Sequence, residues 1–199
     1  ELVPSSLELD LYQGKAFVGL VPFAMQKVRA AWWPGPFTFN FLETNLRTYV
    51  VCNDQPGVFF LSLEAASKLA VWAARTFWGL PYFHADMATT ADGDEVRYTT
   101  VRRGSGESLE VLYRVGEPLG PSKPGSLEFF LLERYLLFCE RRGRLFSGQV
   151  HHQPYPAHTA RVLSLHDELA GAAGLGKLPS LPDYTHYSPG VDVEVFSLH

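Results

Sequence analysis

The strongest constraint on this chain is an alternation of apolar and polar side chains with period two, interrupted by short runs of turn residues. Residues 44–52 show the alternation most clearly. One face there carries Asn45, Arg47 and Tyr49, and the other carries Leu46, Thr48 and Val50. Because the side chains of a strand alternate between two faces, this pattern predicts a strand. Neighbouring runs of this kind are expected to pair antiparallel.

Most of the chain repeats this pattern, so strands are expected to dominate. Turn residues at 53–57, 92–94 and 141–144 predict hairpins between neighbouring strands. Pro22 lacks a backbone N–H and predicts an edge position or a bulge in its strand. Residues 32–36 are expected to form a loop. The predicted strands are 15–28, 44–52, 58–63, 82–90, 96–102, 109–115, 134–139, 145–151, 161–165 and 191–196.

Two helices are predicted among the strands. Residues 64–78 hold good helix formers, with Ser62 as the cap, Glu64 in the first turn and Gly79 as the stop. A second, short helix is expected to begin after Ser126, which can cap it. The predicted fold class is therefore α+β, with a mostly antiparallel, strongly curved sheet, one long helix and one short helix. The apolar stripe expected on the long helix consists of Leu69, Trp72, Ala73 and Phe77.

The length and charge of the chain limit its partners. Its 199 residues suit one domain spanning 1–199. The formal net charge is −4, so no excess of positive charge exists to neutralise phosphates, and nucleic-acid binding is not expected. The basic run at 141–144 is interpreted as a solvated hairpin tip. No stretch reaches the ~18 apolar residues that span a bilayer, so no membrane partner is expected.

Two cysteines, Cys52 and Cys139, are too few for the disulfide scaffold of a small secreted protein. Both lie in apolar runs, and we expect both thiols to be free. The chain begins at Glu1 with no visible export signal, which favours the cytoplasm. Because it lacks an initiator Met, we expect a short segment to precede it.

Two groups of polar side chains share a strand face. The first contains Glu43, Asn45, Arg47 and Tyr49, and this face either is solvated or lines a polar pocket. An arginine flanked by Asn and Tyr is well suited to grip a carboxylate. The second contains Tyr82, His84 and Asp86, where a histidine beside an aspartate can be an oriented base or a structural residue.

A metal site is not expected. His151 and His152 are adjacent on a predicted strand and point to opposite faces, so they cannot easily bind one ion. No H-E-x-x-H or paired C-x-x-C spacing occurs, and no P-loop or dinucleotide motif is present. We therefore expect no cofactor.

Several stretches, taken in order, resemble the uncharacterised bacterial YqjF-like family, a domain of unknown function. They are 42–50, 60–67 leading to 79–83, 126–135, 151–156 and 186–188, and the resemblance covers nearly the whole chain. That family is similar in fold to acetoacetate decarboxylase, whose antiparallel strands curl into a cone around a largely apolar cavity. The resemblance therefore implies a β-cone with a cavity.

The resemblance departs from the decarboxylase at its catalytic motif. In that enzyme a Gly-x-Pro-Lys-Lys motif presents the lysine that forms a Schiff base. The matching stretch here is Gly79-Leu80-Pro81-Tyr82-Phe83, so aromatic residues occupy both lysine positions. A Schiff base needs a primary amine, and Tyr82 cannot supply one. Glu43 lies in the part of the chain that corresponds to a glutamate of the decarboxylase pocket.

Three functions remain open at this point. The first is binding of a small, anionic molecule in the cone, with Glu43, Asn45, Arg47, Tyr49, Tyr82 and His84 as the ligand-binding residues. The second is an enzyme in which Glu43, Tyr82 or His84 performs acid/base chemistry. The third is an interaction module whose interior is filled. A homo-oligomer is compatible with each of these functions. Arg47 is expected to point into the cone near Tyr82 or His84 and to pair with a carboxylate such as that of Glu43.

Borohydride trapping in the presence of acetoacetate should give no covalent adduct, because Tyr82 and Phe83 stand where the amines would be. Peptide mass mapping checks this. An adduct on any lysine would overturn the prediction.

Overall fold

Strands dominate the structure, a computed structural model that describes residues 2–28 and 38–198. Within these residues twelve strands and three short helices, one of which continues as a π-helix, follow one another along the chain. The strands are β1 (Glu8–Leu9), β2 (Val18–Val28), β3 (Phe39–Cys52), β4 (Gln55–Ala65), β5 (Tyr82–Asp92), β6 (Glu95–Arg102), β7 (Ser108–Pro118), β8 (Leu136–Arg141), β9 (Arg144–His152), β10 (His158–Asp167), β11 (His186–Tyr187) and β12 (Val193–Leu198). The helices are α1 (Lys68–Ala73), which continues as the π-helical η1 (Ala74–Trp78), α2 (Leu127–Leu132) and α3 (Leu169–Ala172).

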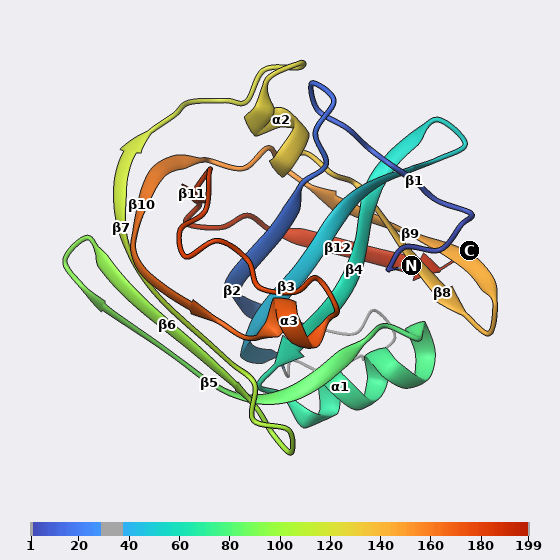
Figure 1. The fold of residues 1–199 in the computed structure, drawn as a ribbon, viewed down its shortest axis with the longest axis horizontal. Helices are drawn as coiled ribbons and strands as arrows, with labels where there is room; N and C mark the ends of the chain where they lie inside the picture. The colour runs from blue at the N-terminus through green and yellow to red at the C-terminus, as the bar shows by residue number, and fades with distance from the viewer. Residues whose placement is uncertain (1, 29–37, 199) are drawn as a thin grey trace.

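The described strands form one strongly curved sheet in the order β11-β10-β7-β6-β5-β4-β8-β9-β12, and β3 with its partners β1 and β2 branches from β4. Figure 1 shows β5, β6, β7 and β10 bending around one side of the molecule. Most neighbours pair antiparallel, so the predicted α+β class is confirmed. No helix in the described part of the chain is long and apolar enough to cross a membrane.

Strand β4 is the branch point of the sheet. It pairs antiparallel with β3 along one edge, from Gln55 to Ala65. Along its other edge it runs parallel first to β8 and then to β5. A bulge accompanies this exchange, since the β3 register skips one residue of β4 between Phe60 and Ser62. The sheet is therefore mixed. Only antiparallel pairing between strands that follow one another was expected from the sequence, so these parallel contacts were not predicted.

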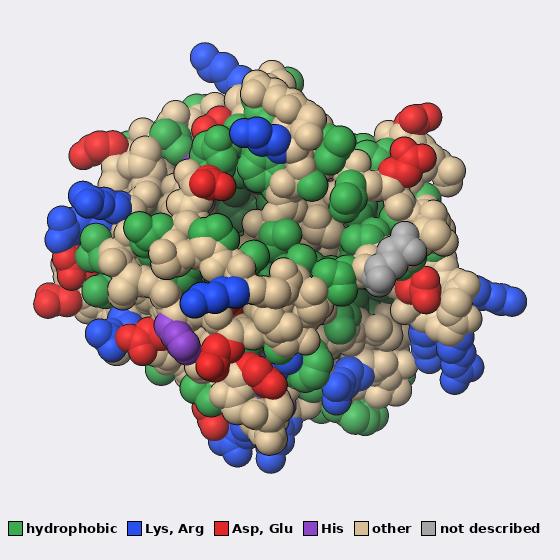
Figure 2. Space-filling view, viewed as in Figure 1, with side chains coloured by type: hydrophobic (Ala, Val, Ile, Leu, Met, Phe, Trp, Pro, Cys, Tyr) green, Lys and Arg blue, Asp and Glu red, His purple; other side chains and the backbone are tan. Residues whose placement is uncertain are grey.

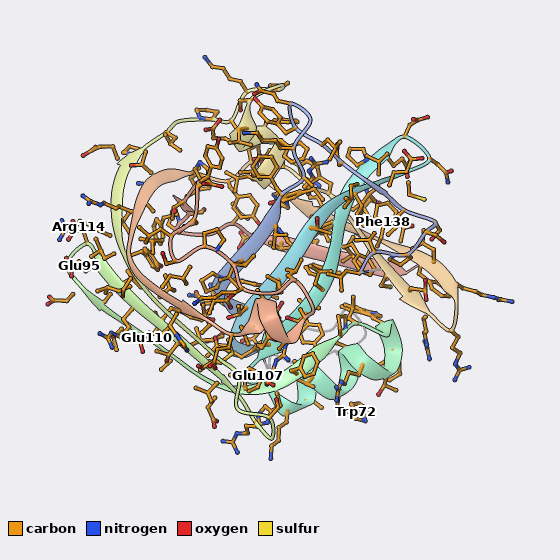
Figure 3. The ribbon with its side chains drawn as sticks, in the orientation of Figure 1. Trp72, Glu95, Glu107, Glu110, Arg114 and Phe138 are labelled. Atoms are coloured by element: carbon orange, nitrogen blue, oxygen red, sulfur yellow. The ribbon has the colours of Figure 1, made fainter. Side chains whose placement is uncertain are left out.

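The predicted long helix is wrong in its first turn and in its buried face. The predicted cap, Ser62, and the first predicted helical residues, 64–65, belong to β4, where pairing with both β3 and β5 outweighs helix propensity. The helix begins after Ser67, whose Oγ accepts a hydrogen bond from Ala70 N at 3.2 Å. Its buried residues are Val71 and Ala74, whereas Leu69, Trp72 and Phe77 are 56%, 57% and 59% exposed. Figure 3 shows Trp72 on the outer side of α1.

Several local predictions are confirmed. Ser126 caps α2 by accepting a hydrogen bond from Phe129 N at 3.2 Å. Pro22 lies on β2, which pairs with β3 alone among the described residues and carries a bulge beyond Met25. The hairpin turns at Asn53–Asp54 and at Arg142–Gly143 use positive φ angles, and β4 begins directly after the first of them. The loop predicted at 32–36 lies outside the described residues.

The apolar core is divided among three clusters of buried side chains. One joins Tyr49 and Val58 to Leu137, the second joins Leu63 and Leu80 to Cys139, and the third joins Leu7 and Val50 to Phe138. All three link β8 to the central strands or to their flanking segments. Both cysteines are free, as predicted, with Cys139 buried and Cys52 half-buried.

The close approach of β4 to β8 leads to a prediction at Gly57. A methyl group there would lie 2.6 Å from Phe138 Cε2 and 2.7 Å from the Leu136 carbonyl oxygen. Gly57→Ala should therefore lower the free energy of unfolding by about 1–3 kcal/mol, measured by urea denaturation.

Gly171→Ala is the matched control, because its methyl group would meet only the Gly176 carbonyl oxygen at 3.8 Å. This substitution should be neutral or stabilise by up to about 1 kcal/mol. Equal effects of the two substitutions would contradict the close packing of β4 against β8.

Candidate functional site

The branch at β4 brings the predicted residues of β3 and β5 to one face of the sheet. Glu43 lies opposite Ala65, which in turn lies beside His84. Asn45 and Tyr82 are likewise related through Leu63. Residues directly opposite each other in a sheet share a face, so Glu43, Asn45, Tyr82 and His84 do so. Glu43 is 5% exposed, and Asn45 and Tyr49 are also buried, so this face is not a solvated surface.

Glu43 and Tyr82 form the centre of this face. The Tyr82 hydroxyl lies 3.1 Å from each carboxyl oxygen of Glu43 and donates a hydrogen bond to this group. Burial raises the pKa of Glu43 to about 8; the Tyr82 hydrogen bond opposes the rise, and the nearby Glu64 charge adds to it. Burial beside Glu43 also raises the pKa of Tyr82 well above its ordinary value. Near pH 7 both groups therefore carry their protons.

Arg47 lies on the same strand but binds a different element. Its Nη2 donates a hydrogen bond to the Leu131 carbonyl oxygen at 3.1 Å, and the Tyr49 hydroxyl donates to the same oxygen at 3.1 Å. Leu131 is in the last turn of α2, where helix carbonyl groups lack partners within the helix. The expected Glu43–Arg47 pair is wrong, because Arg47 forms no ion pair with any carboxylate in the described part of the chain.

Two polar atoms of this face have no partner in the described structure. They are Arg47 Nε and Asn45 Oδ1, and both are buried. A buried donor or acceptor without a partner costs about 1–3 kcal/mol. Such atoms are common where a ligand or water completes the hydrogen bonding.

The idea of a His84–Asp86 base is wrong. Asp86 Oδ1 accepts hydrogen bonds from Arg103 Nε at 2.8 Å and Nη2 at 2.5 Å, and both side chains are exposed. The β5–β6 hairpin causes this, since it places Arg103 beside this end of β5, where its N–H donates to the His84 carbonyl oxygen at 2.9 Å. His84 itself is half-buried on the Glu43 face.

The opposite face of the same strands holds an ion pair that the sequence reading missed. Arg102 donates to Glu64 Oε1 from Nε at 3.0 Å and from Nη2 at 2.6 Å, and the two side chains are 5% and 0% exposed. The Arg102 guanidinium also lies 3.8 Å from the centre of the Phe83 ring. Burial raises the pKa of Glu64 in spite of Arg102. The sequence feature that could have indicated a buried Arg102 is the alternation that places Tyr98, Thr100 and Arg102 on one face of β6.

Tyr82 and Phe83 therefore point to opposite faces, each with its own partner. Tyr82 bonds Glu43, and Phe83 lies under Arg102. All five lysines, in contrast, are exposed; they are Lys15, Lys27, Lys68, Lys123 and Lys177. A desolvated amine, which Schiff-base chemistry needs, is therefore missing from the described residues.

The two adjacent histidines of β9 are separated as predicted. His151 is exposed, whereas His152 is buried between the rings of Tyr135 and Tyr155, at centroid distances of 4.7 and 4.6 Å. Among the described residues, no group of three or more His, Cys, Asp or Glu side chains is arranged to hold a metal ion.

Comparison with known sequences identifies the family. Residues 1–192 match the sequence profile of DUF2071, a family described as uncharacterised conserved proteins. The chain belongs to the DUF2071 family. It is 38% identical over 195 residues to the uncharacterised protein YqjF of Bacillus subtilis, a match that covers 96% of this chain and 80% of YqjF. The resemblance drawn from the sequence is thus confirmed.

Solved structures show that this DUF2071 protein has the acetoacetate decarboxylase fold. The decarboxylase of Legionella pneumophila matches with a TM-score of 0.63 at 15% identity, over 98% of this chain and 75% of the enzyme. The enduracididine biosynthesis enzyme MppR, complexed with pyruvate, matches with a TM-score of 0.59 at 14% identity, over 99% of this chain and 77% of MppR. At these identities the likeness concerns the fold alone.

The raised pKa of Glu43 makes stability depend on pH. The folded protein holds a proton on Glu43 up to about pH 8, whereas the unfolded chain loses it near pH 4.5. Stability should therefore fall as pH rises between these values, by at most about 1.4 kcal/mol per pH unit from this group. Urea unfolding at pH 5.5, 6.5 and 7.5 measures the slope.

Glu43→Gln should flatten this slope, although Glu64 keeps a part of it. Glu117→Gln, at an exposed position, is the control and should leave the slope unchanged. The same slope in wild type and Glu43→Gln would show that Glu43 is ionised in the folded protein.

Proposed function

We propose that this DUF2071 protein binds a small anionic molecule at the face formed by Glu43, Asn45, Arg47 and Tyr82, without Schiff-base chemistry. The observation that carries the proposal is the pair of buried atoms without partners, Arg47 Nε and Asn45 Oδ1, beside a buried carboxyl group. Tyr49 and His84 complete the proposed set of ligand-binding residues. We place the protein in the cytoplasm, and the proposal leaves open a homo-oligomer.

The chemistry of these groups favours a small carboxylate. Arg47 offers a guanidinium N–H that no acceptor in the described part of the chain uses, which suits a carboxylate oxygen. A protonated Glu43 can donate a hydrogen bond to the ligand, whereas an ionised Glu43 would repel it. The neutral state of Glu43 near pH 7 therefore makes the face compatible with an anion.

The structural neighbours support a small ligand without naming one. MppR, which shares the fold, has been crystallised with pyruvate. For this protein, pyruvate is a reasonable first probe of the carboxylate class. The amine-dependent chemistry of a decarboxylase does not carry over, because the lysine positions hold Tyr82 and Phe83.

A second function, acid/base catalysis, is favoured by one observation. A carboxyl group with a pKa of about 8 can exchange a proton near neutral pH, and its partner Tyr82 can hold it in place. Such an enzyme would change the bound molecule. Following the ligand by NMR over hours in the presence of the protein separates catalysis from binding alone.

Native mass spectrometry of freshly purified protein should detect a bound small molecule, and titration with pyruvate and related carboxylates by calorimetry should give a measurable affinity. Arg47→Ala should weaken the binding by about 1.5–3 kcal/mol, the value of a charged hydrogen bond. Arg97→Ala is the control, because Arg97 is exposed and pairs with Glu110. Figure 3 shows Glu110 on the outer strands, away from β3.

Because Arg47 also bonds α2, Asn45→Leu provides a second test that leaves this contact in place. It should weaken binding while urea unfolding shows a folded protein. Unchanged affinity in both Arg47→Ala and Asn45→Leu would contradict the proposed site.

A further inference from the structure

A cleft opens where β4 exchanges β8 for β5. Pairing with β8 ends at Phe59, and pairing with β5 begins at Leu63, so the strands diverge between these points. The resulting cleft has a volume of about 320 Å³ and lies between β8 and the segment 79–81 that leads into β5. Figure 3 shows Phe138, one of its lining residues, where β8 meets β4.

Most of the side chains that line this cleft are apolar, although polar atoms also contribute to its surface. The apolar side chains include Phe59, Leu61, Leu80, Pro81, Phe138 and Ala173. Of the described lining residues, Glu140 alone is charged, and its side chain is exposed. If each non-hydrogen atom of a ligand takes about the volume of a water molecule, about 30 Å³, the cleft accommodates roughly ten such atoms. Its shape and lining suit a short hydrocarbon chain.

A cluster of arginines lies at one end of the cleft. Arg141, Arg142 and Arg144 surround the tip of the β8–β9 hairpin together with Phe146. Gly79 lines the cleft, and the Arg141 side chain packs against it, since a methyl group on Gly79 would lie 3.2 Å from Arg141 Cγ. Figure 2 shows Lys and Arg side chains gathered at this hairpin. The arginine cluster thus adjoins the cleft through Arg141.

The arginines of this cluster lack carboxylate partners among the residues that the structure describes. None of the three arginines forms an ion pair within the described residues, whereas Arg97, Arg102, Arg103, Arg114 and Arg134 all do. Arg141 donates only to the Phe77 carbonyl oxygen, at 3.2 Å. On a chain of net charge −4, three neighbouring guanidinium groups make this surface locally positive, which favours an anion.

We infer that the cleft and the arginine cluster together bind an amphiphilic monocarboxylate, with its hydrocarbon chain in the cleft and its carboxylate on the arginines. The exposed Glu140 at the rim opposes a doubly charged phosphate more than a singly charged carboxylate. This site uses none of Glu43, Asn45, Arg47 or Tyr82, so it is separate from the proposed small-anion site.

Octanoate is the probe, with acetate as the head group alone and octan-1-ol as the chain alone. Calorimetry or protein-observed NMR should show that octanoate binds more tightly than either. Arg142→Gln combined with Arg144→Gln should weaken octanoate about tenfold or more and leave octan-1-ol unchanged. The control, Lys123→Gln combined with Lys177→Gln, removes the same charge from exposed positions elsewhere.

Ala173→Phe should fill the cleft and weaken both octanoate and octan-1-ol. Ala172→Phe is its control, because Ala172 is exposed and does not line the cleft. Unchanged octanoate binding in Ala173→Phe and in the double arginine variant would overturn the inference. Loss of octanoate binding in Glu43→Gln would also overturn it, by placing the probe at the other site. Binding to anionic lipid vesicles without binding of free octanoate would point to a membrane surface and reject the carboxylate site.

Discussion

The arrangement of the whole sheet depends on the pairing of β4. This strand keeps β3 on one edge and divides its other edge between β8 and β5. Gly57 allows β8 to approach, because no side chain larger than hydrogen fits between β4 and Phe138. The bulge before Ser62 lets the strand turn towards β5. Without this division, β5 would not lie in register with β3, and Tyr82 would not reach Glu43.

The same strand register places two buried carboxyl groups, those of Glu64 and Glu43, on opposite faces of the sheet. Glu64 is held on one face by Arg102, which forms two hydrogen bonds and covers Phe83. On the other face, Glu43 has no cationic partner among residues 2–28 and 38–198, and the Tyr82 hydroxyl is its side-chain partner there. A buried carboxylate without a counter-charge is costly, and retaining the proton avoids most of this cost. The aromatic pair Tyr82–Phe83 thus faces a neutral acid on one side of the sheet and an arginine on the other.

Local features of the fold could be predicted from the sequence. The alternation on β3 correctly grouped Glu43 and Asn45, and Ser126 and Pro22 correctly indicated a cap and an edge strand. These features depend on a few neighbouring residues. The parallel contacts of β4 could not be predicted in this way, because they join segments separated by a helix or by three other strands. For this reason the predicted helix starts too early, at residue 64, and the Glu64–Arg102 pair is not predicted.

The partner of Arg47 was also beyond local reasoning. The carboxylate of Glu43 shares its strand face, but the guanidinium instead reaches a carbonyl group of α2, which lies more than 80 residues along the chain. The carbonyl groups at the end of a helix accept hydrogen bonds whatever the side chains there, so no pattern of side chains predicts such a contact. Arg47 Nε finds no partner among the described residues, which could be seen only in the structure.

The neutrality of the Glu43 face depends on the protonated state of this carboxyl group. Carbon-13 NMR of the glutamate carboxyl groups, with the Glu43 signal assigned by its loss in Glu43→Gln, measures this state directly. We expect one carboxyl signal to titrate near pH 8, far from the ordinary value of 4.5. A Glu43 signal that titrates near 4.5 would contradict the account, because Glu43 would then be a carboxylate and the face would repel an anion.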